Sequence, residues 1–577
     1  MSQLDDSSTG AQGVAQVIAA MERPIVFGLP GGDTIQIFDA LRDVGDVEGV
    51  LVREESIGSV MAESYGRLTG RPAVVMGQGA WIPGDGGIGV MEAHLGSSPM
   101  LVLLDATEGG SYSHHGFYQS GFGDYGAYDL PAAMAAITKR TFVALDPVQA
   151  VQMTQLAVKH AMAGEPGPVA VVFHSRALLE RFLPGDLHRL HLGHDYRSPA
   201  PTVDPGSLEA AARAVAGARH PVVLAGNGTR DETARAALLA FAETLDIPVV
   251  TTPGGKSVFP EDHPLAAGVI GSFGHDTANA ILGAADLVLA VGTKIGATDT
   301  MDEHPGLFDA ARQTIVQIDT EPLNLGWTHP VQHPLLGRAQ DVLPHLTAAV
   351  AGTADGGAGG AGRVASARAE LGYFDVPDPV DGPMNPRRLA SLLAEVLPPD
   401  VVVTCDAGEN RLFMLHDFQC RSGGILLQPN GGGGMGYAVP AAMAATYSHP
   451  DRLAVAVAGD GGYAMSLHGL MTAVENGRQL LVVVMDNQAL GWVLHLQGER
   501  PYMSQFAQFD LAAIARAIGC TATEAHTEED VRGAVAKAKQ EPGVYVLVVR
   551  TSLAESFLTI QSAMAGVSHE QVTRPLA

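Results

Sequence analysis

An apolar run that ends in a Gly-Asp-Gly-Gly turn constrains the fold of this 577-residue chain more than any other feature. Residues 455–458 are all Val or Ala, and the turn occupies residues 459–462. A helical pattern over residues 463–476 and a second apolar run over residues 480–485 follow. A strand, a helix and a strand at this spacing predict a βαβ unit whose two strands are parallel and adjacent.

Two side chains that carry oxygen follow these expected strands. Asp460 comes directly after the first strand, and Asn487 follows the second. Because the carboxyl ends of adjacent parallel strands lie side by side, we expect the two side chains to be close together. Such oxygens beside a helix N-terminus suit a hard divalent cation that carries a diphosphate. Each motif alone is common in tight turns, so the prediction of a metal-diphosphate site depends on the pair.

The same alternation of apolar runs and helical patterns fills the rest of the chain. Expected strands lie at residues 24–28, 49–53, 73–76, 100–104, 168–173, 221–226, 247–251, 286–291, 314–319 and 401–404. Alternating strands and helices predict parallel sheets that are covered on both faces. We therefore expect an α/β protein with three doubly wound domains, at residues 1–190, 200–350 and 381–577. A Gly/Ala-rich stretch predicts a flexible linker over residues 351–380.

Composition narrows the class of protein. A formal net charge of −27 argues against nucleic acid or an anionic membrane as the main partner. Cys405, Cys420 and Cys520 are scattered without CxxC spacing, which argues against a disulfide framework or a zinc site. The N-terminus lacks the pattern of a signal peptide, and no apolar run reaches the roughly 18 residues of a membrane span. These features predict a cytoplasmic protein.

The spacing from Gly-Asp-Gly to Asn resembles the cofactor signature of the thiamine diphosphate-dependent enzymes. The family includes acetolactate synthase, oxalyl-CoA decarboxylase and 2-hydroxyacyl-CoA lyase. The resemblance implies thiamine diphosphate and Mg²⁺, with Asp460, Asn487 and the backbone carbonyl of Ala489 as metal ligands. Gly461 and Gly462 would lie beside the diphosphate. It also implies pyrimidine-binding, middle and diphosphate-binding domains, and a homodimer or homotetramer with active sites between subunits.

A glutamate near the N-terminus matches a second motif of that family. Glu55 precedes an Ala-x-x-Tyr-x-Arg pattern at residues 62–67. The resemblance implies that Glu55 is the catalytic glutamate, which shares a proton with the pyrimidine N1′ of the cofactor. A carboxyl in an apolar cleft has the raised pKa that this role requires. The alternative is a favourable charge in the first turn of a helix.

Two Gly-containing segments resemble further parts of the family's cofactor site. Residues 428–442 read QPNGGGGMGYAVPAA, which implies that Met435 supports the bent cofactor and that the Gly433 carbonyl accepts from its 4′-amino group. Asn410 lies in a Gly-Glu-Asn segment where relatives bind the diphosphate. This segment is more similar to oxalyl-CoA decarboxylase and 2-hydroxyacyl-CoA lyase than to acetolactate synthase. Glu409 would repel a diphosphate, so we expect its side chain to point elsewhere.

The residues that select the substrate depart from the pattern of acetolactate synthases. Their Phe-Gln-Glu loop is replaced here by GGSYSHHGFYQSGFGDYGAY, which contains His114, His115 and Gln119. Imidazoles in this loop could carry protons to or from the substrate. The alternative is an aromatic surface loop without a catalytic role.

The segment after the metal motif is where relatives build the substrate wall. Trp492 would narrow the pocket if it points inward. His495 or Glu499 could act as a second acid or base, although each could equally be a solvated helix residue.

The middle domain offers a weaker signal. It lacks the Arg-Phe-Asp-Asp-Arg-like stretch of the members that hold FAD, so FAD is not expected. Residues 226–229 and Asp319 could hold ADP, as the middle domain of the acyl-CoA branch does.

The resemblance implies an enzyme that cleaves or forms a C–C bond next to a carbonyl of a small-molecule substrate. The Gly-Glu-Asn segment and the His-bearing loop favour an acyloin-type lyase or ligase similar to 2-hydroxyacyl-CoA lyase. The alternatives are an acetolactate synthase-like enzyme of 2-oxo acids and a non-catalytic homologue that binds the cofactor.

Overall fold

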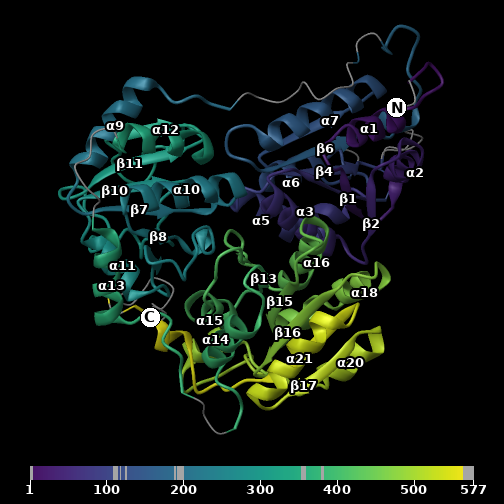
Figure 1. Ribbon diagram of the computed structural model, residues 1–577. Helices are drawn as coiled ribbons and strands as arrows, with labels where there is room; N and C mark the ends of the chain where they lie inside the picture. The colour runs from purple at the N-terminus through teal and green to yellow at the C-terminus, as the bar shows by residue number, and fades with distance from the viewer. Residues whose placement is uncertain are drawn as a thin grey trace, which may run out of the picture. The chain divides into compact units, whose positions relative to one another are not determined.

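The computed structural model describes residues 4–107, 115–116, 118–123, 126–187, 190, 200–351, 359–378, 382–562 and 564 (Figure 1). It contains three six-stranded sheets in which every strand pair is parallel, so the predicted α/β fold is confirmed. The chain divides into two compact units. The first unit comprises residues 1–199, 429–450 and 465–478, and the second comprises residues 200–428, 451–464 and 479–577. None of the described helices is long and apolar enough to cross a membrane.

The first unit contains one sheet with the strand order β2-β1-β3-β4-β6-β5. Its strands are β1 (Ile25–Gly28), β2 (Glu48–Leu51), β3 (Ala73–Gly77), β4 (Met100–Asp105), β5 (Arg140–Ala144) and β6 (Pro168–Phe173). Its helices are α1 (Gly10–Ala19), η1 (Gly32–Thr34), α2 (Ile35–Val44), α3 (Glu55–Thr69), α4 (Trp81–Gly84), α5 (Gly87–Leu95), α6 (Leu130–Ile137), α7 (Pro147–Met162), α8 (Ser175–Leu179), α16 (Ala438–Ser448) and α18 (Leu467–Glu475).

Helices cover both faces of this first sheet, which explains why its central strands are continuous apolar runs. Every residue of β4 and of β6 is buried. Helices α1 and α7 pack on one face, where Val14 and Ile18 join Leu101 and Val169 in a common core. Helices α3 and α5 lie on the other face (Figure 1). Helix α3 is therefore fixed against the sheet, and its first residue is Glu55.

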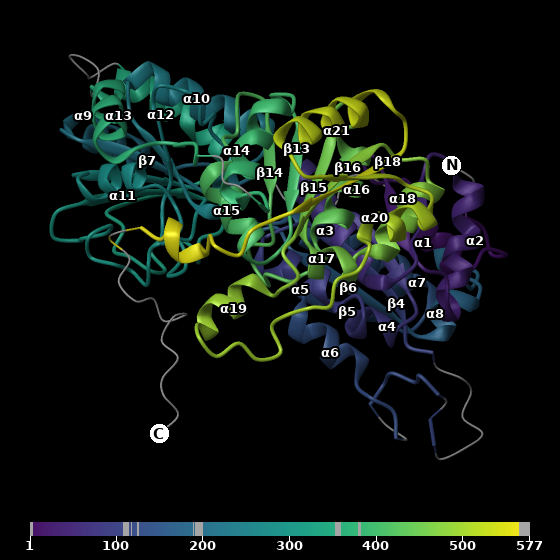
Figure 2. The same cartoon turned by 90° about the horizontal axis from the view of Figure 1, so that it is seen from below.

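The second unit contains two sheets, with the orders β12-β11-β10-β7-β8-β9 and β14-β13-β15-β16-β18-β17. The first of these two is built from β7 (Pro221–Ala225), β8 (Val249–Thr251), β9 (Ala266–Val269), β10 (Leu287–Val291), β11 (Thr314–Asp319) and β12 (His333–Leu336), with α9 (Pro205–Gly217), η3 (Asn227–Thr229), α10 (Glu232–Leu245), η4 (Pro253–Gly255), α11 (Asp276–Gly283), α12 (Ala339–Ala351) and α13 (Gly360–Leu371). The other is built from β13 (Val402–Cys405), β14 (Ile425–Leu427), β15 (Ala454–Gly459), β16 (Leu480–Asp486), β17 (Thr521–Ala525) and β18 (Val544–Arg550), with α14 (Pro386–Val396), α15 (Glu409–Asp417), α17 (Asp460–Met465), α19 (Gly491–Gln497), α20 (Leu511–Ile518), α21 (Glu528–Gln540) and η5 (Phe557–Ile560). Helices α14 and α21 pack together on one face of this last sheet (Figure 2).

The βαβ unit expected around the Gly-Asp-Gly-Gly turn is present, with one correction. Strands β15 and β16 are parallel neighbours, and Gly459 lies opposite Met485. The single helix expected over residues 463–476 is wrong, because the chain forms α17 and then α18. Ser466 separates them with φ −108° and ψ 14°, which lie outside the α-helical range and interrupt the helix.

The expected flexible linker over residues 351–380 also needs correction. Residues 360–371 form helix α13, whose Val364 is fully buried. The Asp246 carboxylate accepts hydrogen bonds from the backbone N–H groups of Gly360 and Ala361, at 3.1 and 3.0 Å, and so caps the helix N-terminus. The prediction from Gly and Ala content is wrong for these residues, because a distant carboxylate and a core contact order them. Residues 352–358 and 379–381 lie outside the described residues.

A buried ion pair stabilises the second unit. The side chain of Lys256 is fully buried, and its Nζ donates to Glu261 Oε1 and Oε2 at 2.6 and 2.8 Å. Glu261 Oε2 also accepts from the backbone N–H of Cys420 at 2.7 Å. Neither charge reaches water, so each depends on the other for its solvation.

Replacement of Lys256 tests this dependence. Lys256→Met should lower the free energy of unfolding by roughly 3–5 kcal/mol, because it leaves the Glu261 carboxylate buried without its cation. Urea unfolding of the purified protein measures the change. The matched control is Lys537→Met on the exposed face of α21, which should stay within about 0.5 kcal/mol of wild type. Similar losses in both variants would contradict a special role for the buried pair.

Candidate active site

Glu55 is buried beside two glycines, Gly77 and Gly86. It is the first residue of α3, directly after β2, and 7% of its surface is exposed. A Cβ at Gly86 would lie 3.3 Å from the Glu55 Cβ, and one at Gly77 would lie 3.7 Å from the Glu55 Cγ. Burial raises the pKa of Glu55, and repulsion from Asp85 and Glu54 adds a smaller increase.

This environment gives Glu55 the properties of a proton-sharing acid. Within the residues that the structure describes, its carboxyl has no side-chain hydrogen-bond partner. A buried carboxyl with a raised pKa keeps its proton to a higher pH than an exposed one, and it can share that proton with a ring nitrogen. The alternative of a simple first-turn charge does not account for the burial, since such charges gain their energy at exposed positions.

The glycine-rich segment before α16 belongs to the same unit. Gly433 has φ +65°, and no atom lies within 4 Å of the position that its Cβ would take. Met435 is half-buried, and Tyr437 behind it is fully buried. Gly433 and Met435 thus lie in one loop before α16, and their contacts with the cofactor stay predictions.

Asp460 and Asn487 follow the adjacent strands β15 and β16 of the second unit. Asp460 is 8% exposed, and its Oδ1 accepts from the backbone N–H of Gly461 at 2.9 Å. Burial raises the pKa of Asp460 to about 6. The Asn487 Oδ1 accepts from the Ala489 N–H at 3.0 Å, which folds the turn after β16. No group of three or more His, Cys, Asp or Glu side chains suited to a metal occurs among the described residues.

These residues fit a magnesium diphosphate. A raised pKa means that the surroundings of the buried carboxylate do not stabilise its negative charge. A divalent cation would supply that stabilisation. The ligand set of one carboxylate, one amide and one carbonyl is what Mg²⁺ accepts when a phosphate completes the shell. A Cβ at Gly462 would lie 2.7 Å from the Asp406 carboxylate, so this position requires glycine.

Asn410 lies at the same edge of the third sheet. Its Nδ2 donates to the Asp406 carbonyl at 3.1 Å, and a Cβ at Gly459 would lie 3.7 Å from its Oδ1. The amide is therefore near the carboxyl ends of β13 and β15. Gly408, with φ +107°, makes the sharp turn that starts α15. This placement agrees with a diphosphate contact, which stays a prediction.

The neighbouring Glu409 is turned toward a histidine. Glu409 Oε1 lies 2.7 Å from His495 Nδ1 and accepts from the Phe557 N–H at 2.9 Å. His495 Nε2 lies 3.0 Å from the Leu553 carbonyl. Both ring nitrogens face acceptors, so the protonated imidazolium satisfies both contacts, and the hydrogen bond to Glu409 raises the pKa of His495. His495 therefore links α15, α19 and the C-terminal segment of the described chain.

Two other residues after the metal motif lie apart from this pair. The Trp492 ring stacks on Phe557 at 4.4 Å and contacts Phe273 edge-on at 5.6 Å, in an apolar cluster. Glu499 follows the end of α19 and is exposed. A pocket-narrowing role for Trp492 and an acid–base role for Glu499 stay predictions.

Part of the expected substrate loop is described. His115 is exposed, and its Nδ1 lies 2.9 Å from the Gly116 carbonyl. Gln119 has φ +65°, and its Oε1 accepts from Gln78 Nε2, which joins the loop to the segment after β3. His114 lies outside the described residues. Catalytic roles for these residues stay predictions.

In the middle sheet of the chain, backbone packing accounts for the glycines that suggested a nucleotide site. A Cβ at Gly226 would lie 2.4 Å from the Gly292 oxygen, and one at Gly228 would lie 2.7 Å from the Gly292 Cα. The Asp319 Oδ1 accepts from the Glu321 N–H at 2.9 Å. An ADP site there is therefore not needed to explain these residues, and it stays a prediction.

Three family models match successive parts of the chain. The N-terminal binding domain of the thiamine pyrophosphate enzymes matches residues 8–125, the central domain matches residues 208–346, and the C-terminal binding domain matches residues 406–549. The chain belongs to the thiamine pyrophosphate enzyme family. Thiamine diphosphate is thus its cofactor, and the alternative of a non-catalytic homologue is set aside.

Similar proteins span nearly the whole chain. A probable acetolactate synthase large subunit of Methanocaldococcus jannaschii is 28% identical over 579 residues, which cover 95% of this chain and 92% of that protein. The acetolactate synthase large subunit of Corynebacterium glutamicum is 28% identical, with 92% and 85% covered. A probable 2-ketoarginine decarboxylase of Pseudomonas aeruginosa is 29% identical, with 95% and 94% covered. The protein is a thiamine diphosphate-dependent carboligase or decarboxylase.

The raised pKa of His495 predicts a pH dependence of stability. A histidine whose pKa is higher in the folded state contributes stability that is complete below its unfolded pKa, about 6.5, and is lost as the pH rises through the folded pKa. The free energy of unfolding should therefore fall above about pH 6.5, and this part of the fall should be absent in His495→Gln. Urea unfolding between pH 6 and pH 9 measures it. His526→Gln, at an exposed histidine, is the control and should keep the wild-type profile.

Proposed function

We propose that this protein removes CO₂ from a 2-oxo acid and then either releases the aldehyde or joins the remaining acyl group to a second carbonyl compound. The observation that carries the proposal is the buried Glu55 with its raised pKa. Similarity along the whole chain to proteins named acetolactate synthase and 2-ketoarginine decarboxylase supports a 2-oxo acid as the substrate.

Each end of the cofactor has its own set of residues in this proposal. Bound thiamine diphosphate supplies a nucleophilic carbon and a ring that accepts the electrons of the broken C–C bond. Glu55 holds the proton at the pyrimidine N1′, and the Gly433 carbonyl accepts from the 4′-amino group. Asp460, Asn487 and the Ala489 carbonyl hold Mg²⁺. Asn410 and the backbone of Gly461 and Gly462 contact the diphosphate, and Met435 supports the bend between the rings.

Protons on the substrate side come from residues outside this cofactor set. His114, His115, Gln119 and Glu499 are the candidates, as donors to the product or as contacts to the carboxylate of the substrate. The proposal includes a homo-oligomer with active sites between subunits. ADP in the middle domain is the weakest part of it, because backbone packing explains the residues concerned.

A second candidate function is cleavage of a 2-hydroxyacyl-CoA, in which a ketone or aldehyde leaves in place of CO₂. The observation that favours it is the Gly-Glu-Asn sequence of residues 408–410, which is more similar to oxalyl-CoA decarboxylase and 2-hydroxyacyl-CoA lyase than to acetolactate synthase. Glu409 is bonded to His495, so Asn410 is the member of the segment at the edge where a diphosphate would bind. Both functions use the same cofactor chemistry, so the substrate decides between them.

A pair of variants tests the two ends of the cofactor site separately. Glu55→Gln should lower kcat on the order of 10²–10⁴-fold, because the amide cannot share a proton with N1′, while thiamine diphosphate still binds. Asp460→Asn should instead weaken cofactor binding and raise the Mg²⁺ concentration needed, because it removes the only charged ligand of the proposed set. Steady-state kinetics and titration calorimetry measure the two effects. An unchanged kcat in Glu55→Gln would remove Glu55 from the chemistry.

A substrate panel tests the reaction itself. Pyruvate, longer 2-oxo acids, 2-ketoarginine and 2-hydroxyacyl-CoA esters are each supplied with thiamine diphosphate and Mg²⁺. We expect CO₂ release from at least one 2-oxo acid, with an aldehyde or a 2-hydroxy ketone identified by mass spectrometry. Turnover of the 2-hydroxyacyl-CoA esters alone would overturn the proposal in favour of the second candidate.

A further inference from the structure

One buried carboxylate in the first unit binds four successive backbone N–H groups. Glu92 Oε1 accepts from the N–H groups of Asn430 and Gly431 at 2.7 and 2.8 Å. Glu92 Oε2 accepts from those of Gly432 and Gly433 at 2.7 and 3.2 Å. Glu92 is 2% exposed. A run of N–H groups that converge on one anion is a backbone nest, and here the anion is supplied by the chain itself.

The glycine-rich loop of residues 430–434 lies along one face of helix α5. A Cβ at Gly431 would lie 2.4 Å from the Leu95 Cβ, and one at Gly434 would lie 2.4 Å from the Ile88 Cδ1. Ile88, Glu92 and Leu95 have the spacing of one helix face. The loop therefore needs glycine at residues 431 and 434 to approach the helix, and Glu92 is the polar residue at the centre of that contact.

The carboxylate and the loop depend on each other. A buried carboxylate without partners is costly, and four N–H groups satisfy both of its oxygens. The four N–H groups would in turn lose their common acceptor without Glu92. The contact consequently fixes the orientation of the successive peptide groups that end in the N–H of Gly433.

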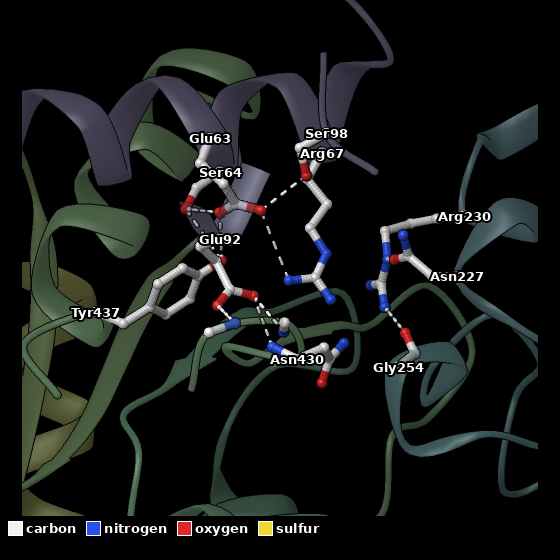
Figure 3. A network of polar contacts seen from close by, with 12 residues as sticks. Glu63, Ser64, Arg67, Glu92, Ser98, Asn227, Arg230, Gly254, Asn430 and Tyr437 are labelled. Atoms are coloured by element: carbon white, nitrogen blue, oxygen red, sulfur yellow. Dashed lines mark hydrogen bonds and ion pairs between the residues drawn. The ribbon is translucent and has the colours of Figure 1, made fainter. Parts of the chain in front are cut away.

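The other end of the loop is fixed to helix α3. The Tyr437 hydroxyl donates to Glu63 Oε2 at 2.7 Å, and Ser98 Oγ donates to Glu63 Oε1 at 2.8 Å (Figure 3). Arg67 Nη1 lies 3.8 Å from Glu63 Oε1. Glu63 is two turns after Glu55 in the same helix. The segment between the two anchors contains the Gly433 carbonyl and Met435.

The direction of the Gly433 carbonyl follows from these anchors. The Gly433 N–H is held by Glu92, so only the two dihedrals of Gly433 lie between the held N–H and that carbonyl. Its φ of +65° is one that glycine adopts without strain. The space beside its Cα is open within 4 Å, which leaves room for a ring to approach.

We propose that Glu92 is a positioning residue for the aminopyrimidine of the cofactor: its carboxylate binds the N–H groups of residues 430–433 and thereby aims the Gly433 carbonyl at the 4′-amino group. The inference rests on the proposed contact between Gly433 and the cofactor. Glu92 itself does not touch the cofactor, so its effect is on the ring end and not on the diphosphate end.

Glu92→Gln tests the inference, because the amide keeps the size of the side chain but turns an NH₂ group toward two of the N–H donors. Backbone hydrogen exchange of residues 430–433, followed by mass spectrometry, should become faster in the apo-protein. The affinity for thiamine diphosphate should fall roughly 10-fold, the effect of about one lost buried hydrogen bond. The affinity for inorganic pyrophosphate with Mg²⁺, which lacks the rings, should stay at the wild-type value.

Two further variants keep the test informative. Glu92→Asp retains the charge but is one methylene shorter, so its ratio of thiamine diphosphate to pyrophosphate affinity should lie between those of wild type and Glu92→Gln. It also serves if Glu92→Gln does not fold. Asp146→Ala removes the N-cap of α7 in the same unit and should lower Tm without changing the ratio.

An unchanged affinity ratio in both Glu92 variants would overturn the inference, as would an equal change of the ratio in Asp146→Ala. The measurement is of binding alone and needs no turnover. The variants can therefore give the expected affinity ratios even if the wild-type protein releases no CO₂ from any 2-oxo acid. That result would count only against the proposed function.

Discussion

The parallel pairing of β15 with β16 is the constraint on which the metal end of the cofactor site depends. The carboxyl ends of neighbouring parallel strands lie at the same edge of the sheet. Asp460 and Asn487 are therefore brought together, although they are 27 residues apart in the sequence. Burial of both strands on their two faces makes this register costly to change. A shift of one residue would exchange the side chains that face the two sides of the sheet, disturb the packing of both cores and separate the two oxygens.

Buried carboxylates recur in the two units, and their partners decide what each one does. Burial raises the pKa of Glu55, which suits an acid that shares a proton with the cofactor. Burial also raises the pKa of Asp460, which suits a carboxylate that binds a metal cation. Glu92 instead has four backbone N–H partners, and Glu409 has a histidine and one N–H group. Glu55 and Asp460 are available for chemistry because the protein does not compensate the negative charge of their carboxylates. Glu92 and Glu409 are used to hold the chain in place.

Sequence patterns predicted the central strands well and the edge strands poorly. Six strands were not expected: β5, β9, β12, β14, β17 and β18. All but β18 are the outermost strands of their sheets, and β18 is a buried inner strand. An edge strand is covered less, so its residues are more polar and the apolar run that identifies a strand is short or absent, as in β5 and β12. The helix α13 was likewise hidden in a Gly/Ala-rich stretch, because its order comes from Asp246, more than a hundred residues earlier.

By itself, the sequence determined the alternation of strands and helices, the thiamine diphosphate family and the candidate roles of Glu55, Asp460 and Asn487. Those conclusions rest on local patterns, in which strand ends and turn residues are a few positions apart. Only the tertiary structure showed that Glu92 binds residues 430–433 and that Glu409 binds His495. These contacts join residues far apart in the chain, and an acidic side chain on a helix has the same sequence pattern whether it faces water or a ring of N–H groups.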